Sequence, residues 1–120
     1  SYAYCYSVDD FLQSPAGKYL ARKSETADFD ERRMIRLAGR VKPDSVERDM
    51  DKLLLRFELL GQKGSVTVTY HGAVPRNFVE GKEVFVEGRV LENRTFNATR
   101  ILTRCESKYK VKLQTKVDTR

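Results

Sequence analysis

The sequence predicts an all-β domain in the form of a small closed barrel. From Arg33 onward, apolar and polar residues alternate with a period of two. Six such segments follow one another at short intervals and are separated by turn residues. A single short helical turn is expected between the fourth and the fifth segment. This pattern is typical of an OB-type barrel of five to six antiparallel strands, here with flexible N- and C-terminal segments.

The chain before the barrel has a different composition. Ser7 is followed three residues later by Asp10, and this spacing satisfies free backbone amides at the start of a short helix. Pro15 and the glycine two residues later are expected to end this helix. Residues 16–32 are mostly polar and charged, so we expect a loop or linker there.

The first three strands of the barrel are separated by turn residues. Residues 33–41 form the first strand, and Gly39 lies where a strongly bent strand needs a residue without a side chain. Residues 45–48 are expected to form a short second strand after the turn at Pro43. Residues 53–60 form the third.

The second half of the barrel contains the clearest strand of the chain, over residues 65–71, because its apolar side chains share one face and its polar side chains the other. One helical turn is expected at residues 75–79. Residues 83–91 form the fifth strand. Residues 95–102 form the last, and their imperfect alternation indicates an edge position.

Charge and length complete the domain assignment. A chain of 120 residues has room for one domain, and its formal charge is +6. Residues 104–120 contain six basic and two acidic residues, so this tail holds +4 of the total. We assign residues 1–32 to an N-terminal segment and linker, residues 33–103 to the OB-type barrel, and residues 104–120 to a flexible basic tail.

Catalytic chemistry finds little support in the sequence. No Gly-rich phosphate loop or paired carboxylates stand out, so we expect a protein that is not an enzyme. The single histidine, His71, ends a strand on its polar face and is expected to be solvated. Two cysteines and one histidine are too few for a structural zinc site. No apolar run is long enough to cross a membrane.

Cys105 and Tyr109 are the residues best suited to chemistry. Cys105 follows the last strand and has basic neighbours, which favour its thiolate. Tyr109 lies four residues later and shares a face with it in either a helix or a strand. A thiol and a phenol on one segment could hold a porphyrin and its iron. Alternatively, the pair is incidental, or Cys105 forms a disulfide with Cys5.

A longer set of motifs resembles a known family. From Arg33 to Tyr109 the chain is similar to cytochrome c maturation protein E (CcmE), a family of periplasmic heme chaperones. The order of the motifs is specific, and they cover about two-thirds of the chain. The matching segments are IRLAGRV at 35–41, GSVTVTYHGAVP at 64–75, FVEG at 78–81 and VEG at 86–88.

The resemblance implies a role for each residue of the CxxxY motif. In the family, a histidine after the last strand bonds covalently to a heme vinyl group, and a tyrosine four residues later is an axial ligand of the iron. Cys105 occupies the histidine position here, so the chain resembles the CxxxY branch of the family. Cys105 would then attach heme, and Tyr109 would bind the iron. The proline-rich continuation common after the tyrosine is replaced by Lys110-Val111-Lys112.

The resemblance also implies a cofactor and partners. The cargo would be heme b (iron protoporphyrin IX), received from membrane heme-delivery and heme-ligation proteins and passed to apocytochrome c. The expected location is the periplasmic face of the bacterial inner membrane, with a single-pass N-terminal anchor outside this sequence. Nucleic acid is not an expected partner. The alternative is an OB-fold module that binds single-stranded nucleic acid or protein, although the sequence offers no aromatic cluster for base stacking.

Overall fold

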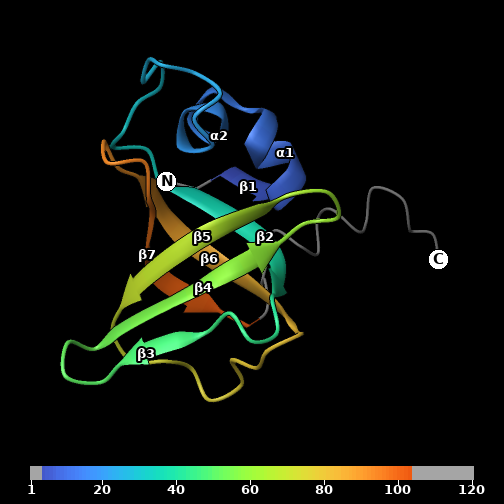
Figure 1. The fold of residues 1–120 in the computed structure, drawn as a ribbon, viewed down its shortest axis with the longest axis vertical. Coiled ribbons are helices and arrows are strands. Elements are labelled where there is room, and N and C mark those ends of the chain that lie inside the picture. Colours follow the sequence, from blue (N-terminus) through green and yellow to red (C-terminus); the bar gives the residue numbers. More distant parts are fainter. Residues whose placement is uncertain (1–3, 104–120) are drawn as a thin grey trace.

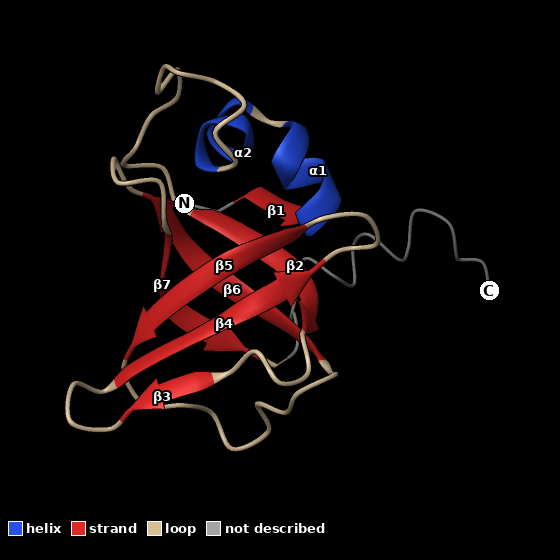
Figure 2. Cartoon of the chain, viewed as in Figure 1, coloured by secondary structure: helices blue, strands red, loops and turns tan. Residues whose placement is uncertain are grey.

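The computed structural model describes residues 4–103. In this range a β-barrel is covered at one end by two short helices (Figure 1). Strands make up most of the described chain (Figure 2). The elements in chain order are β1 (Tyr4–Ser7), α1 (Val8–Gln13), α2 (Pro15–Leu20), β2 (Ile35–Val41), β3 (Glu47–Asp49), β4 (Leu54–Leu60), β5 (Ser65–His71), β6 (Glu83–Val90) and β7 (Phe96–Leu102).

Strand pairing closes the sheet into a barrel. The strand order is β1-β2-β6-β7-β5-β4-β3, and an additional pairing between β2 and β4 closes the five-stranded ring. All six strands expected from the sequence are present, and β1 is an addition. Most pairings are antiparallel as predicted, but β1 pairs with β2 in parallel and β5 pairs with β7 in parallel.

The core fills the inside of the barrel. Alternate residues of β4 and β5 are buried, as the period of two predicts. The side chains in the barrel strands that are less than 2% exposed are Val41, Leu37, Leu55, Phe57, Leu59, Val66, Val68, Val84, Val86, Val90 and Phe96.

Two serines define the helices near the N-terminus. The Ser7 side chain accepts a hydrogen bond from the backbone amide of Asp10 (3.1 Å), which confirms the predicted helix start. Ser14 ends α1 and also caps α2, because its side chain accepts a hydrogen bond from the Gly17 amide (3.1 Å). Pro15 occupies the first turn of α2, where its missing N–H costs nothing. The first helix ends before Pro15 as predicted, but residues 16–20 belong to α2, so the prediction of a loop from residue 16 is wrong there.

These helices contribute to the same core as the strands. Val8 and Phe11 are 0% exposed, and Ala16 and Tyr19 are also buried. All four belong to the single hydrophobic cluster that fills the barrel. The Phe11 ring makes an edge contact with Phe96 of β7, with 6.0 Å between ring centroids. Residues 4–20 thus pack as part of the barrel domain, whereas the sequence pattern placed them in a separate segment.

A carboxylate also holds α1 against the β4–β5 hairpin. Asp9 accepts hydrogen bonds from the backbone amides of Gly64 (2.9 Å), Gln62 (2.8 Å) and Lys63 (3.1 Å). The amide of Gly64, together with those of Gln62 and Lys63, holds the pKa of Asp9 below its ordinary value of 3.8, although partial desolvation opposes this shift. The ionised carboxylate therefore fixes the helix to the turn.

The last strand differs from its prediction in two ways. β7 pairs with both β6 and β5, so it is not an edge strand. Its alternation is broken by a β-bulge, where Gly88 is opposite Ala98 and Glu87 is opposite Arg100, leaving Thr99 as the additional residue. Beyond the bulge, Ile101 turns into the core and Arg100 is exposed. The irregular pattern thus reflects an insertion.

The structure also differs from the sequence-based expectation at the second strand of the barrel and at residues 75–79. The second strand of the barrel spans Glu47–Asp49 instead of residues 45–48. The segment at 75–79 forms a turn closed by a hydrogen bond from the Phe78 amide to the Pro75 carbonyl (3.1 Å), and it contains no helix. Within the described part of the chain, no helix has the length and apolar character needed to cross a membrane.

Candidate functional site

The candidate site begins where β7 ends. Cys105, Tyr109 and the tail assigned to residues 104–120 lie outside the described residues. Cys105 is the third residue after Leu102, the last residue of β7. Covalent geometry therefore keeps its Cα within about 11 Å of the Leu102 Cα. A ligand attached at Cys105 is thus tethered within reach of the barrel surface around the end of β7.

An apolar row lies on that surface. Leu102 of β7 is opposite Phe85 of β6, and Phe85 is opposite Ala38 of β2. Paired residues on neighbouring strands point to the same face of a sheet. Phe85 lies on the opposite face of β6 from the core residues Val84 and Val86 and is not part of the core cluster, although only 3% of it is exposed. Ala38, Phe85 and Leu102 therefore form an apolar row on the outside of the barrel.

A charged row runs beside the apolar row. Glu87 is opposite both Arg36 and Arg100 in the strand register. One oxygen of its carboxylate accepts a hydrogen bond from Arg36 (2.9 Å), and the other accepts one from Arg100 (3.2 Å). Two arginine side chains thus share the carboxylate of Glu87. The Arg100 side chain remains 58% exposed.

The β-bulge gives the charged row its geometry. Gly88 lies next to Glu87, and a Cβ at Gly88 would collide with the carbonyl oxygen of Asn97. The close approach of β6 and β7 at this point therefore requires glycine. Thr99, the additional residue, donates a hydrogen bond from its hydroxyl to the Glu87 carbonyl (3.2 Å). The bulge brings Arg100 opposite Glu87, and bulges of this kind often re-aim side chains near functional sites.

The other residues named by the sequence lie apart from these rows or at their margin. Cys5 is exposed on β1 opposite Arg36, so it marks the edge of the charged row. His71 is exposed at the end of β5, opposite Leu54. Residues 4–103 contain no group of three or more His, Cys, Asp or Glu side chains arranged to hold a metal ion.

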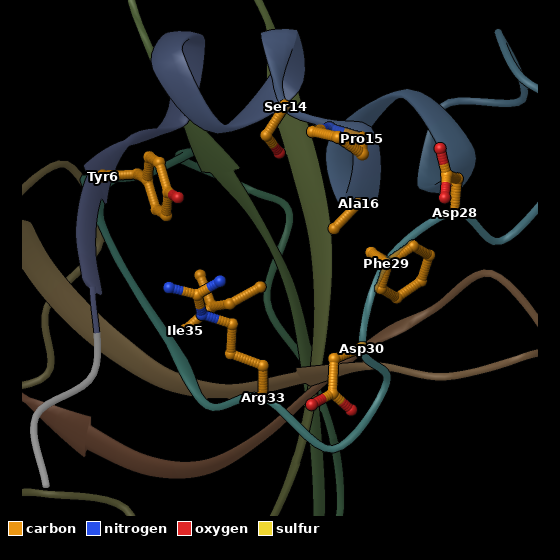
Figure 3. Close-up of a pocket in the computed structure, with 9 residues that line it drawn as sticks. All are labelled: Tyr6, Ser14, Pro15, Ala16, Asp28, Phe29, Asp30, Arg33 and Ile35. Carbon is orange, nitrogen blue, oxygen red and sulfur yellow. The ribbon is translucent and has the colours of Figure 1, made fainter.

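A small pocket lies at the start of β2, beside Ile35. It has a volume of about 200 Å³ and opens between α2 and the chain segment that leads into β2. Figure 3 shows Tyr6 and Phe29 on opposite sides of the opening, with the carboxylates of Asp28 and Asp30 turned away from it. Ile35, at the start of β2, contributes to its wall, whereas the apolar row includes Ala38, three residues further along. The pocket is therefore separate from the surface at the end of β7.

The two rows were not visible in the sequence. From the sequence alone, Phe85 is expected to be a core residue of a buried strand, because it lies between Val84 and Val86. Glu87 and Arg100 become partners only through the bulge. The signal available in the sequence was the run of three apolar residues at 84–86, which leaves one apolar side chain on the outside of a two-faced strand.

Comparison with known proteins is consistent with this architecture. Residues 4–112 match the CcmE domain. The "Cytochrome c-type biogenesis protein CcmE" of Yersinia enterocolitica is 37% identical over 101 residues, which are 83% of this chain and 61% of that protein. The chain therefore spans less than two-thirds of this relative.

Solved structures show the same fold. The solution structure of the OB-fold domain of the heme chaperone CcmE from Desulfovibrio vulgaris has a TM-score of 0.54 and 33% identity, and the match covers 64% of this chain and 92% of that domain. The yeast Stn1 and Ten1 structure has a TM-score of 0.60 over 96% of this chain and 70% of that chain, but at 10% identity it shows only the fold. The predicted OB-type barrel is thus confirmed. With the domain matched over residues 4–112, the chain belongs to the CcmE family.

Proposed function

We propose that this protein is a heme chaperone of cytochrome c maturation. It binds heme b, carries it in a transient covalent bond and passes it to apocytochrome c. It acts as a stoichiometric carrier and not as an enzyme. The observation that supports this proposal is the apolar row of Ala38, Phe85 and Leu102 beside Arg36 and Arg100, at the point where the chain leads to Cys105. A flat apolar ring with carboxylate substituents is complementary to such a surface.

Cys105 is the attachment residue in this proposal. Its thiol adds across the C=C bond of a heme vinyl group, so that an S–C bond forms and the thiol proton goes to the neighbouring carbon. The addition consumes no oxidant or reductant. Release is the reverse elimination, which restores the vinyl group and the thiol. Basic neighbours favour the thiolate that starts the addition.

Tyr109 supplies an axial oxygen ligand to the iron. A phenolate oxygen is a hard anionic donor that suits ferric iron, as it does in heme proteins with a tyrosine ligand. Four residues separate Tyr109 from Cys105, so one short segment holds both the edge of the ring and its metal. Residues 104–120 are the part of the chain that carries this motif.

The partners follow from this role. Membrane heme-delivery and heme-ligation proteins of the cytochrome c maturation system load and unload the chaperone, and apocytochrome c receives the cargo. The domain acts at the periplasmic face of the inner membrane, where an N-terminal anchor would hold it. We include no nucleic acid among these partners.

Hemin titration under reducing conditions tests the proposal. Visible spectroscopy follows binding, and mass measurement after denaturation detects a covalent adduct. Cys105→Ala should abolish the adduct but retain reversible binding. Tyr109→Phe should shift the ferric spectrum, since the iron loses its phenolate ligand. Cys5→Ser is the matched thiol control and should keep the adduct. A covalent adduct in Cys105→Ala would move the attachment to another residue, with His71 the first to examine.

A neighbouring pair of residues tests the surface itself. Phe85→Thr should weaken hemin binding by about tenfold, because an aromatic contact worth roughly 1–1.5 kcal/mol is lost. Both substitutions should lower stability, because Phe85 and Val84 are both buried, but Val84→Thr, on the opposite face of β6, should leave hemin affinity nearly unchanged once the protein is folded. Equal hemin affinities in Phe85→Thr and the wild type would remove the apolar row from the site.

A further inference from the structure

A second concave surface lies on the outside of β4 and β5. It is a groove of about 410 Å³ whose floor comes from these two strands. One wall is the end of α2 with residues 20–22, and the other is the β6–β7 turn at residues 93–95. Figure 2 shows β4 and β5 crossing the front of the barrel, with α2 above them. The rows that form the proposed heme site belong to other strands, so this groove is a separate feature.

The walls of the groove are fixed to each other. The Tyr19 hydroxyl donates a hydrogen bond to the Glu92 carbonyl (2.6 Å), which joins residues 73 positions apart. Arg94 donates to the Tyr19 carbonyl (3.1 Å), and its guanidinium lies 4.4 Å from the centre of the Tyr19 ring. These contacts hold α2 against the β6–β7 turn. The groove is therefore formed before any ligand binds, which lowers the entropic cost of binding.

Hydroxyl side chains and one arginine line the floor of the groove. The outward side chains of β5 in the groove are Ser65, Thr67 and Thr69, which all carry hydroxyls. Arg56 of β4 is opposite Thr69, and Glu58 is opposite Thr67. Glu58 accepts a hydrogen bond from the Thr67 hydroxyl, so the carboxylate already has a partner. The Thr69 hydroxyl donates to the Phe96 carbonyl (3.5 Å), so the donors that the floor offers to a ligand are Ser65 and Arg56.

The charge of the groove is positive. Arg22, Arg56 and Arg94 contribute to its surface, and Glu58 is the one carboxylate among the lining residues. The ion pairs formed within residues 4–103 involve other arginines, so none of these three guanidiniums is paired with a carboxylate there. Arg22 and Arg94 are held at positive φ (63° and 64°), an uncommon backbone conformation for a residue with a side chain. The groove is therefore complementary to an anion.

We propose that this groove binds an extended acidic peptide segment of a partner protein. The three cations come from three separate elements, so they suit carboxylates spaced along a chain better than a single small anion. The lining contains no aromatic ring, and binding of single-stranded nucleic acid usually relies on base stacking on such rings. The chain's own tail, residues 104–120, is basic and carries the wrong charge to fill the groove.

Fluorescence anisotropy with the full chain tests this proposal. The probe is a short fluorescein-labelled peptide of alternating Glu and Ser, and the same peptide with Gln in place of Glu is the neutral control. The basic tail also attracts an acidic peptide, so three double variants with equal loss of charge are compared. Arg22→Gln with Arg56→Gln removes charge from the groove. Lys110→Gln with Lys112→Gln removes it from the tail, and Arg40→Gln with Arg76→Gln removes it from exposed sites elsewhere.

The groove variant should lose about tenfold or more in affinity for the acidic peptide, and each control about twofold, with all affinities falling as salt is raised. Amide resonances of Ser65, Thr67 and Thr69 should shift during the titration, while hemin binding by the groove variant stays at the wild-type level. Equal losses in the groove and control variants, or no peptide-induced shifts in β5, would overturn the proposal. So would tighter binding of oligo(dT) than of the peptide at these same residues. Because hemin is measured separately, failure here leaves the proposed heme function untouched.

Discussion

Phe11→Ala is the most informative test of where the folding unit begins. Phe11 is 0% exposed, and its ring contacts Tyr6 (6.4 Å between centroids) and Phe96 of β7 (6.0 Å). Removing a buried phenylalanine side chain typically costs about 3–5 kcal/mol, including the cavity it leaves. Alanine favours the helix by about 0.5 kcal/mol relative to phenylalanine. A net loss of about 2.5–4.5 kcal/mol is therefore expected.

This loss is large for a domain of this size. With roughly 0.05–0.15 kcal/mol of stability per residue, the domain has about 5–15 kcal/mol in total. Urea unfolding followed by circular dichroism should show a single transition, with its midpoint lowered by roughly 2 M at a typical urea dependence. Val79→Ala is the control, because Val79 is 46% exposed and its truncation should change stability by less than about 0.5 kcal/mol.

Two outcomes of the Phe11→Ala experiment would refute the role of α1 in the core. If residues 1–32 were an appendage to a barrel that begins at residue 33, Phe11→Ala would behave like the Val79 control. A loss below about 1 kcal/mol, with an unchanged midpoint, would refute the argument that α1 is part of the core. Loss of α1 in a separate early transition would also refute it, since the single hydrophobic cluster predicts cooperative unfolding.

Three further predictions concern the bulge and the attachment of the helices. Gly88→Ala should destabilise the protein by more than about 2 kcal/mol in urea unfolding, because the new Cβ collides with the β7 backbone; wild-type stability would contradict the requirement for glycine. The hydrogen bond from the Gly64 amide, with its two neighbours in the turn, lowers the pKa of Asp9 in the folded state, so the stabilisation it gives is complete well above pH 3.8 and is lost as the pH falls through the lowered value. Asp9→Asn should therefore reduce the acid dependence of the melting temperature, and an identical pH profile would contradict this. Tyr19→Phe should cost about 1 kcal/mol in thermal unfolding, since the hydrogen bond to Glu92 is lost, and an unchanged melting temperature would show that this bond contributes nothing.

The barrel strands could be predicted because their information is local. A period of two and turn residues are enough to locate β2 and β4 to β6, since each pattern is complete within its own strand. β7 was misread as an edge strand because its pattern is broken at Thr99. The reason for that break lies in the partner strand, where Gly88 permits the bulge.

The N-terminal helices show a second limit. Ser7 was recognised as a cap because its partner is three residues away. α2 was missed because Pro15 both ends one helix and begins the next, and the sequence alone does not separate these roles. Packing against the distant β6–β7 turn supports α2, and no local window contains that contact.

The candidate site also has a part that is predictable from the sequence and a part that depends on the fold. Cys105 and Tyr109 can be proposed from the sequence because they belong to one short motif. The surface beside them requires the registers of β2, β6 and β7, which bring Arg36, Glu87 and Arg100 into one row. These residues are far apart in sequence, so their grouping is a property of the closed barrel.

Closure of the barrel also affects how the protein behaves at high concentration. Among the described strands, those with a single neighbour are β1, which has four residues, and β3, which has three. β3 reads Glu-Arg-Asp, and charged side chains on a short edge discourage pairing with a strand of another molecule. A long unpaired edge strand promotes self-association by strand addition. Here the described strands offer little free edge for that reaction, so the protein should have a low tendency to aggregate by strand pairing.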